Sequence, residues 1–297
     1  MPPPISILFC GTSAFAVPSL EALLADEVFA VQLVVTQPDR PAGRKQILTP
    51  PPVKLVAEKH GIPILQPEKI NAEVSRLASR VSRPDFLVVV SFGQILSQAI
   101  LDFPTRMPVN VHASLLPRFR GASPIQHAIL DGDTVSGVTV QRIVKELDAG
   151  PILAQERLKI PPRATFESLH DQLAPLGARL LLQTLKNPIQ EEPQDESELV
   201  FCRRLTREDG IADTNTQTAA EIDRKVRALN PWPGVTIMLD GQPLKLLETA
   251  MEDSHDAYPL PCRAGSTLYL LSVQPAGKNP MSGAAWRRGK RIESEKS

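Results

Sequence analysis

The first half of this 297-residue chain alternates short apolar runs with amphipathic stretches, and no other feature constrains the fold as much. The apolar runs cover residues 5–11, 29–37, 86–90 and 109–112, and helical patterns such as 18–27 lie between them. Strands that alternate with helices predict a parallel sheet with helices on both faces. Residues 86–90 are all apolar, as expected of a central strand that is covered on both sides. We therefore predict an α/β fold with a Rossmann-like, mostly parallel sheet.

Two polar residues interrupt the apolar pattern at the end of the strand predicted over residues 109–112. Side chains alternate between the faces of a strand, so Asn110 and His112 share one face and Val111 points to the other. Ligands of open α/β sheets bind beyond the carboxyl ends of the strands. An amide can donate to an oxyanion and an imidazole can move protons near neutral pH, so the pair indicates acyl transfer. A buried structural histidine beside a turn asparagine is the alternative that this short spacing leaves open.

Charge is balanced over the whole chain but not locally. There are 33 Lys and Arg residues and 33 Asp and Glu residues, so any binding of nucleic acid must rest on local clusters. Residues 37–54 predict a long, exposed loop between a strand and a helix, and loops of that length are uncommon unless functional. Its charged residues are Arg40, Arg44, Lys45, Lys54 and Asp39, and a second basic cluster comprises Lys278, Arg287, Arg288, Lys290, Arg291 and Lys296. Surface loops with incidental charge are the alternative.

Cysteine and histidine spacing argues against disulfides and metals. Cys10, Cys202 and Cys262 lie far apart, and the five histidines show no paired ligand spacing. The start of the chain lacks a basic leader, and no apolar run reaches membrane-spanning length. We expect a monomeric cytoplasmic protein with no metal, no cleaved leader and no membrane segment.

The second half of the chain predicts a small β-rich domain. A helical pattern around residues 169–181 is followed by an acidic, proline-containing stretch at 187–198. Beyond it we predict a helix and short strands, at residues 219–229, 235–239, 244–248 and 268–273. The expected domains are 1–186, a linker over 187–206, and 207–297.

Several blocks of this sequence resemble the folate-dependent formyltransferases. They are VNVHASLLPRFRGASPIQ at 109–126, LDAGPIL at 147–153, FCGTSAFAVPSLEALL at 9–24, TQPDRPAGRKQILTPPPVK at 36–54, ALNPWPG at 228–234 and LLSVQPAGKNPMS at 270–282. The resemblance implies a Rossmann-like catalytic domain followed by a barrel of the oligonucleotide-binding kind. It also implies transfer of a formyl group from the co-substrate 10-formyltetrahydrofolate to the α-amino group of methionyl initiator tRNA, in translation initiation.

The resemblance carries residue roles with it. Asn110 stabilises the oxyanion, His112 shuttles protons, and Asp148 orients the imidazole and favours its charged form. The implied folate contacts are Ser114, Leu115, Leu116, Pro117, Phe92, Gly93 and Ile95, and the implied tRNA contacts are Arg40, Arg44 and Lys45. At the positions of Gln46 and Ile47 the family usually has further basic residues. The segment between Asp253 and Gly265 is shorter than expected for the barrel of the family.

Two other functions fit parts of the sequence. One is a folate-dependent formyltransferase or hydrolase that acts on a small molecule, against which the basic loop and the second domain argue. The other is a non-catalytic RNA-binding protein on a decayed enzyme fold, which the shortened barrel permits.

Overall fold

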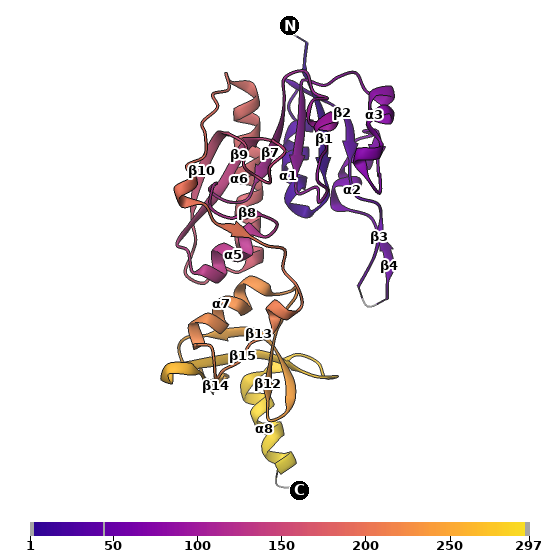
Figure 1. Ribbon diagram of the computed structural model, residues 1–297. Helices are drawn as coiled ribbons and strands as arrows, with labels where there is room; N and C mark the ends of the chain where they lie inside the picture. Colours follow the sequence, from indigo (N-terminus) through magenta and orange to yellow (C-terminus); the bar gives the residue numbers. More distant parts are fainter. Residues whose placement is uncertain (1–2, 44, 295–297) are drawn as a thin grey trace. The chain divides into compact units, whose positions relative to one another are not determined.

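The computed structural model describes residues 3–43 and 45–294, which form two compact units (Figure 1). Each unit is assembled from three separate stretches of the chain. The first unit comprises Met1–Gly121, Val135–Lys159 and His170–Phe201, and the second comprises Ala122–Thr134, Ile160–Leu169 and Cys202–Ser297.

The first unit is built on a seven-stranded sheet with the order β10-β9-β7-β6-β1-β2-β5. Its strands are β1 (Ile5–Gly11), β2 (Phe29–Val35), β5 (Ile64–Leu65), β6 (Phe86–Val90), β7 (Met107–His112), β9 (Val135–Arg142) and β10 (Ile152–Lys159). From β5 to β7 neighbouring strands are parallel, whereas β9 is antiparallel to both β7 and β10. All five residues of β6 are buried, as its apolar run predicted. The predicted α/β fold with a mostly parallel sheet is confirmed.

The first unit also contains helices and short 3-10 turns. They are α1 (Val17–Leu24), α2 (Pro52–Lys59), α3 (Val74–Arg80), α4 (Gln98–Leu101), the part of α6 (Phe166–Lys186) that begins at His170, and the 3-10 turns η1 (Ala14–Ala16), η2 (Ile70–Ala72) and η3 (Glu196–Glu198). Cys10 lies in a buried cluster with Leu33 and Leu87, and burial raises the pKa of its thiol. A thiolate nucleophile at Cys10 is therefore disfavoured, in line with direct acyl transfer.

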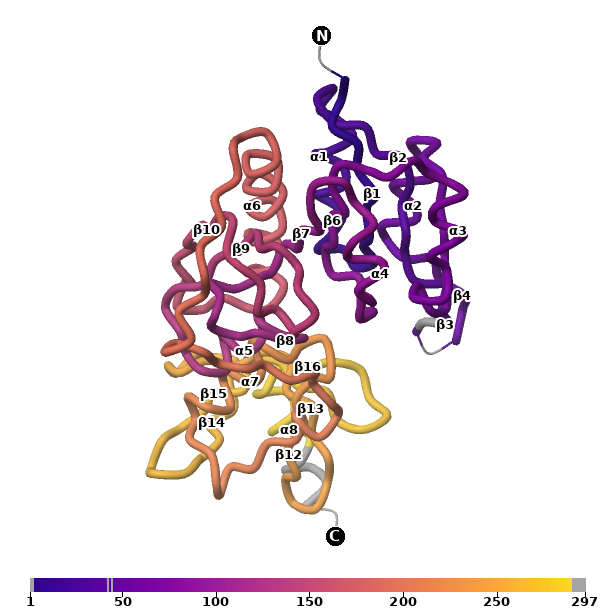
Figure 2. Tube along the Cα trace, turned by 45° about the horizontal axis from the view of Figure 1, so that its top comes forward, coloured from indigo at the N-terminus to yellow at the C-terminus, as the bar shows by residue number. Residues whose placement is uncertain are grey.

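Helix α6 packs closely against β7 on the face opposite Asn110 and His112. A Cβ added at Gly177 would lie 2.8 Å from Val111 Cγ1 and 3.3 Å from Val138 Cγ1. The glycine thus allows α6 to approach β7 and β9, and Figure 2 shows the helix beside β9. Val111 is 3% exposed, so it has little room to move.

Adding a methyl group at this contact should destabilise the first unit. We expect Gly177→Ala to lower the free energy of unfolding by about 1–3 kcal/mol, because overpacking a stiff, buried valine forces local shifts. Urea unfolding followed by far-UV circular dichroism measures this loss. Tryptophan fluorescence is less suitable, because both tryptophans, Trp232 and Trp286, lie in the second unit. The additional change Val111→Ala should restore part of the loss, and unchanged stability of the single variant would contradict this packing.

The basic segment predicted as a loop contains a β-hairpin instead. Strands β3 (Arg40–Ala42) and β4 (Ile47–Thr49) pair antiparallel, with Arg40 opposite Thr49 and Pro41 opposite Leu48. The hairpin projects away from the large sheet (Figures 1 and 2). Positive φ angles of 68° at Gly43 and 49° at Gln46 let the chain reverse there. The segment is exposed as expected, but its paired strands were not predicted, because the turn chemistry was not recognised.

The second unit contains an antiparallel sheet with the order β12-β13-β15-β14, and β16 pairs with β15. Its elements are α5 (Pro124–Asp131), η4 (Glu208–Gly210), α7 (Ala219–Leu229), β12 (Val235–Leu239), β13 (Gln242–Ala250), β14 (Tyr258–Pro261), η5 (Arg263–Gly265), β15 (Thr267–Pro275), β16 (Met281–Ser282) and α8 (Gly283–Ser294). Two further short strands, β8 (Arg120–Gly121) and β11 (Phe201–Cys202), form a separate ladder, and all their residues but Cys202 belong to the first unit. The β-rich second domain expected from the sequence is confirmed.

A buried carboxylate organises the second unit. Asp223 on α7 is 3% exposed and accepts hydrogen bonds from Arg163 at 2.8 Å, Arg227 at 2.9 Å and Thr249 at 2.8 Å. Because a buried charge is costly without partners, these residues tie residues 160–169 to α7 and β13.

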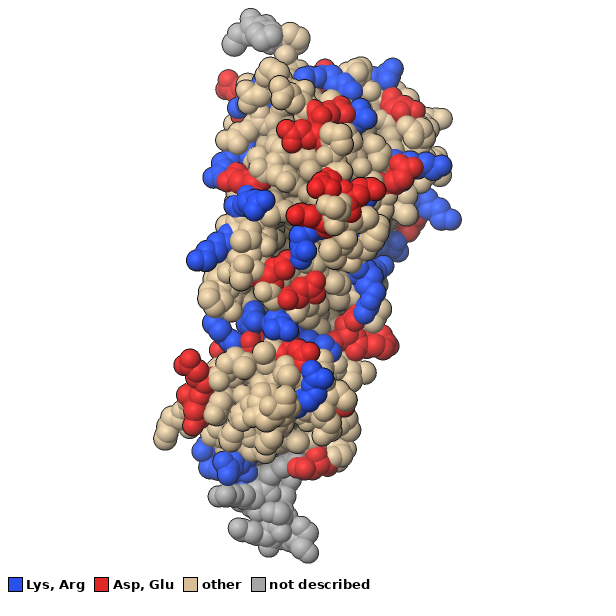
Figure 3. All heavy atoms as spheres, turned by 60° about the vertical axis from the view of Figure 1, so that its left-hand side comes forward, with Lys and Arg blue, Asp and Glu red and all other residues tan. Residues whose placement is uncertain are grey.

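Charged side chains of both signs share the surface on one face of the molecule. On the face shown in Figure 3, Lys and Arg side chains are interspersed with Asp and Glu. No helix among residues 3–43 and 45–294 is both long enough and apolar enough to cross a membrane.

Candidate active site

Strand β7 places Asn110 and His112 on one face near its carboxyl end, as the strand period predicted. Asn110 pairs with Val89 on β6 and with Gln141 on β9, and His112 pairs with Thr139. His112 is 6% exposed and Asn110 is half-buried. The pairing on both sides of β7 fixes the directions of these side chains.

The two ring nitrogens of His112 face different groups. The carbonyl oxygen of Phe119 lies 2.8 Å from Nε2, and because a carbonyl only accepts, we assign the proton of the neutral ring to Nε2. Nδ1 lies 3.7 Å from Asp148 Oδ2, which is longer than a hydrogen bond. Nδ1 is therefore the nitrogen that remains for exchanging a proton.

Both carboxylate oxygens of Asp148 are held in place. Oδ2 accepts the backbone N–H of Gly121 at 2.9 Å, and Oδ1 accepts Gln141 Nε2 at 3.1 Å. Asp148 itself has a φ of 49°, in the left-handed region that non-glycine residues rarely adopt. The carboxylate is thus directed toward His112 by a loop of unusual conformation.

Glycine at position 150 allows this loop to close. A Cβ there would lie 1.7 Å from the carbonyl oxygen of Arg142, so only glycine fits. The LDAG run therefore brings Asp148 back beside β7 through a tight return between β9 and β10.

Asn110 presents a side-chain amide for a ligand. Its carboxamide makes no hydrogen bond within the described part of the chain, and it is half-buried beside His112. An amide donor beside an imidazole–carboxylate pair can stabilise an oxyanion while a proton moves.

The run from Ser114 to Pro117, predicted to bind folate, makes several hydrogen bonds within the protein. Ser114 Oγ donates to the carbonyl oxygen of Arg118 at 2.6 Å. The Leu116 N–H donates to Thr139 Oγ1 at 3.1 Å, and the Leu116 carbonyl accepts Gln155 Nε2 at 2.7 Å. Both backbone groups of Leu116 are therefore already hydrogen-bonded within the protein. Leu116 is also buried, whereas its neighbour Leu115 is partly exposed.

The other predicted folate residues follow β6. Phe92 is 2% exposed and belongs to the core, and Gly93 has a φ of 85°. Ile95 is 81% exposed, so its side chain contributes little to packing. An exposed isoleucine at the carboxyl end of a parallel strand suits a ligand-contacting role better than a structural one.

The first unit also holds a cavity of about 620 Å³ that the sequence reasoning missed. Its apolar lining residues are Leu101, Pro104, Met107, Pro108, Ile143 and Val144, and its polar ones are Gln98, Asp102, Arg106, Arg142, Lys145 and Glu146. Ile143 and Val144 lie on the loop that carries Asp148. This apolar pair directly after β9 was the sequence feature that could have indicated the cavity.

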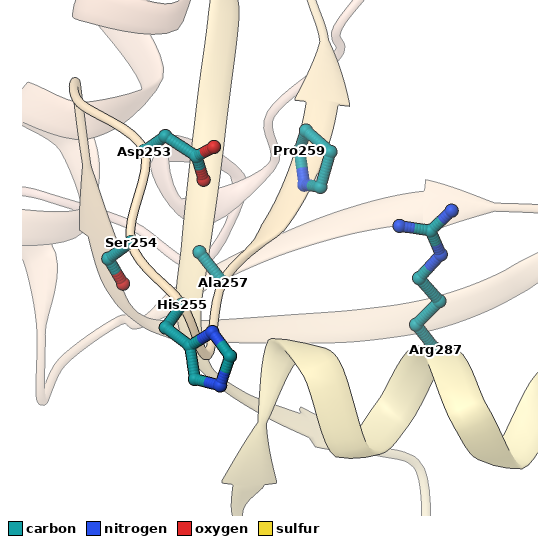
Figure 4. A pocket seen from close by; sticks show the side chains of 6 residues that line it. All are labelled: Asp253, Ser254, His255, Ala257, Pro259 and Arg287. Carbon is teal, nitrogen blue, oxygen red and sulfur yellow. The ribbon is translucent and has the colours of Figure 1, made fainter.

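A smaller cavity of about 430 Å³ lies in the second unit. Figure 4 shows Asp253, Ser254 and His255 on the loop before β14, and Arg287 on α8. Arg287 belongs to the basic cluster predicted near the C-terminus, and its guanidinium lies 5.9 Å from the ring centre of Tyr258. Acidic and basic groups thus share this cavity.

Two of the three predicted tRNA contacts, Arg40 and Lys45, lie on the β3–β4 hairpin. Arg40 forms an exposed ion pair with Glu68 at 2.5 Å, and Lys45 is exposed. Lys54, by contrast, is paired with Asp39 at 2.7 Å and is mostly buried. Arg44 lies outside the described residues.

Comparison with known proteins decides the family. A formyl transferase family model matches residues 5–185, and the model of the formyl transferase C-terminal domain matches residues 204–291. The methionyl-tRNA formyltransferase of Roseiflexus sp. (strain RS-1) is 43% identical over 97% of this chain and 94% of its own length. The one from Geobacter metallireducens is 40% identical over 97% of each chain. This chain belongs to the methionyl-tRNA formyltransferase family.

Two solved structures share the fold. HypX from Aquifex aeolicus in complex with tetrahydrofolic acid matches with a TM-score of 0.61 and 16% identity, over 94% of this chain and 46% of that one. An N-formyltransferase from Helicobacter canadensis, in complex with folinic acid and dTDP-3-aminofucose, matches with a TM-score of 0.66 and 18% identity, over 91% and 99% of the two chains.

Within this formyltransferase, the structure adds three residues to the predicted site. Gln141 and Gly121 hold the carboxylate of Asp148, and Phe119 accepts from His112. Phe119 and Gly121 belong to the SLLPRFRG run, so the resemblance contained a signal for them. For Gln141 the only signal was its position opposite Asn110 on the neighbouring strand.

Proposed function

We propose that this enzyme transfers the formyl group of 10-formyltetrahydrofolate to the α-amino group of methionyl initiator tRNA, as its family membership implies. One observation carries the catalytic assignment. Asn110 and His112 share a face of β7, and Asp148 Oδ2 lies 3.7 Å from the ring nitrogen of His112 that has no short hydrogen bond.

The residues suit each step of the reaction. The neutral amine attacks the formyl carbon, and Asn110 donates to the oxyanion that forms. His112 takes the proton that the nitrogen loses and returns one to the leaving N10 of the folate, while Asp148 stabilises the charged ring. The C–N10 bond then breaks, giving tetrahydrofolate and the formylated amine.

The folate contacts are part of the proposal. They are Ser114, Leu115, Leu116, Pro117, Phe92, Gly93 and Ile95. Related support comes from HypX, a protein of similar fold that binds tetrahydrofolic acid. The 620 Å³ cavity beside the Asp148 loop is of a size that small-molecule sites have, and it offers a second place for the folate ring.

Truncating Ile95 distinguishes these two places. We expect Ile95→Ala to raise the KM for 10-formyltetrahydrofolate about tenfold, since a side chain covered by a ligand contributes about 1.5–3 kcal/mol. Its 81% exposure predicts unchanged thermal stability. Leu55→Ala, at an exposed leucine on α2, is the matched control. A normal KM in Ile95→Ala together with a raised KM in Val144→Ala would place the ring in the cavity instead.

The acceptor tRNA is proposed to contact both units. The β3–β4 hairpin offers Arg40 and Lys45, Arg44 is proposed as a further contact from the sequence, and the second unit offers the cations of its C-terminal helix. The proposed functional domains remain 1–186 and 207–297, with 187–206 joining them. A monomer acting in the cytoplasm completes the proposal.

Transfer of labelled formyl groups tests the function directly. The acceptors are methionyl initiator tRNA, methionyl elongator tRNA and free methionine, each with 10-formyltetrahydrofolate. Transfer confined to the initiator supports the proposal. Transfer to none of them, with tRNA still bound, would point to a non-catalytic RNA-binding protein. If the protein binds folate but neither binds tRNA nor transfers the formyl group to these acceptors, its acceptor is a small molecule.

A further inference from the structure

A single glutamine of the segment that follows α6 reaches the loop of the catalytic carboxylate. Gln194 is partly buried, whereas its neighbours Asp195 and Glu196 are exposed. Its Nε2 donates to the carbonyl oxygen of Asp148 at 2.8 Å and to that of Gly150 at 2.7 Å. Both hydrogens of the amide are therefore used on the backbone of the LDAG run.

The other end of the Gln194 side chain is held from the opposite side. Arg120, which is 4% exposed, donates from Nε to Gln194 Oε1 at 2.9 Å. Two backbone hydrogen bonds between Glu192 and Ile152, at 2.7 and 2.9 Å, anchor the segment beside β10. Gln194 thus joins a buried arginine to the Asp148 loop at fixed geometry.

The Asp148 loop needs such support. Asp148 has a φ of 49°, a conformation that persists only where the surroundings hold it. Gln141, which bonds the Asp148 carboxylate, also has its Oε1 3.4 Å from Gln194 Nε2. Gln194 therefore supports the backbone of Asp148 directly and lies beside the glutamine that holds its carboxylate.

We infer that Gln194 is a positioning residue, which holds the Asp148 loop so that the carboxylate faces His112. The inference rests on the proposed role of Asp148 in formyl transfer. Gln194 itself acts only through Asp148 and contacts neither substrate.

The isosteric variant Gln194→Glu is the sharpest test. Its carboxylate keeps an acceptor for Arg120 but cannot donate to the two carbonyl oxygens, so folding should survive while the loop loses its hold. Gln190→Ala, at an exposed glutamine of the same segment, is the matched control. All variants are made in the full chain.

We expect Gln194→Glu to lower kcat about 10- to 100-fold, because a small displacement of a catalytic group has effects of that size. The KM values for tRNA and folate should match those of the wild type and of Gln190→Ala. The melting temperature of Gln194→Glu should fall by only a few degrees, because two carbonyl oxygens lose their donor. In the presence of Asp148→Asn, Gln194→Glu should cause no further loss, since both changes act on one group.

Two results would overturn the inference. One is a wild-type kcat in Gln194→Glu, and the other is losses that multiply in the double variant, as for a merely structural residue. Failure of the proposed function has a different signature, since the wild type and Gln190→Ala would then transfer no formyl group at all.

Discussion

Replacing His112 by alanine should lower kcat for formyl transfer by about 10²–10⁴-fold, the usual contribution of a positioned acid–base group. The reason lies in the surroundings of the ring. Nε2 is bonded to the Phe119 carbonyl at 2.8 Å, and Nδ1 lies 3.7 Å from Asp148 Oδ2. In the proposed mechanism, alanine removes the ring that takes the amine proton. Single-turnover transfer at saturating substrates measures the loss.

Controls separate this loss from damage to the fold. His112 is buried, so alanine leaves a cavity, whereas His112→Gln can still donate to the Phe119 carbonyl. His60→Ala, at an exposed histidine, should transfer at the wild-type rate. If both variants at position 112 bind folate and keep wild-type turnover, proton transfer by His112 is refuted.

Asp148→Asn should reduce turnover on a similar scale, about 10²–10⁴-fold, while folate binding stays measurable. The substitution removes the negative charge 3.7 Å from Nδ1 of His112. Both oxygens of Asp148 accept hydrogen bonds, one from the N–H of Gly121 and one from the amide of Gln141. The NH₂ group of asparagine cannot accept either bond, so one of these donors loses its partner.

A folate-binding titration of the same variant shows whether Asp148 acts in the chemical step or in binding the carrier. A drop in transfer with an unchanged dissociation constant for the folate assigns Asp148 to the chemical step. Equal turnover in variant and wild type would remove Asp148 from the mechanism, and loss of folate binding would assign it to the carrier site.

Local patterns predicted the elements that depend on local physics. Strand β6 and helix α7 were predicted with the bounds that the structure has, Phe86–Val90 and Ala219–Leu229. An all-apolar run marks the strand, and Thr218 and Glu221 form the capping box that begins the helix. The shared face of Asn110 and His112 followed from the strand period alone.

Contacts between distant residues could not be predicted in this way. Gln141 and Gln194 are ordinary amides, 7 and 46 positions from Asp148, and no periodicity marks either of them. The positive φ of Asp148 is likewise invisible in the sequence, whereas the glycine two positions later, Gly150, can be read from it. The β3–β4 hairpin was missed because its strands have three residues each, too few for an alternating pattern.

The way the second unit is assembled limits how this protein can be taken apart. Helix α5, with Ile125 and Ile129 buried, and the residue Arg163 come from within the first 186 residues, yet they belong to the same compact unit as Asp223. A fragment cut out as 207–297 would expose part of α7 and leave a buried carboxylate short of one cation. A fragment meant to keep the second unit whole should therefore also contain residues 122–134 and 160–169.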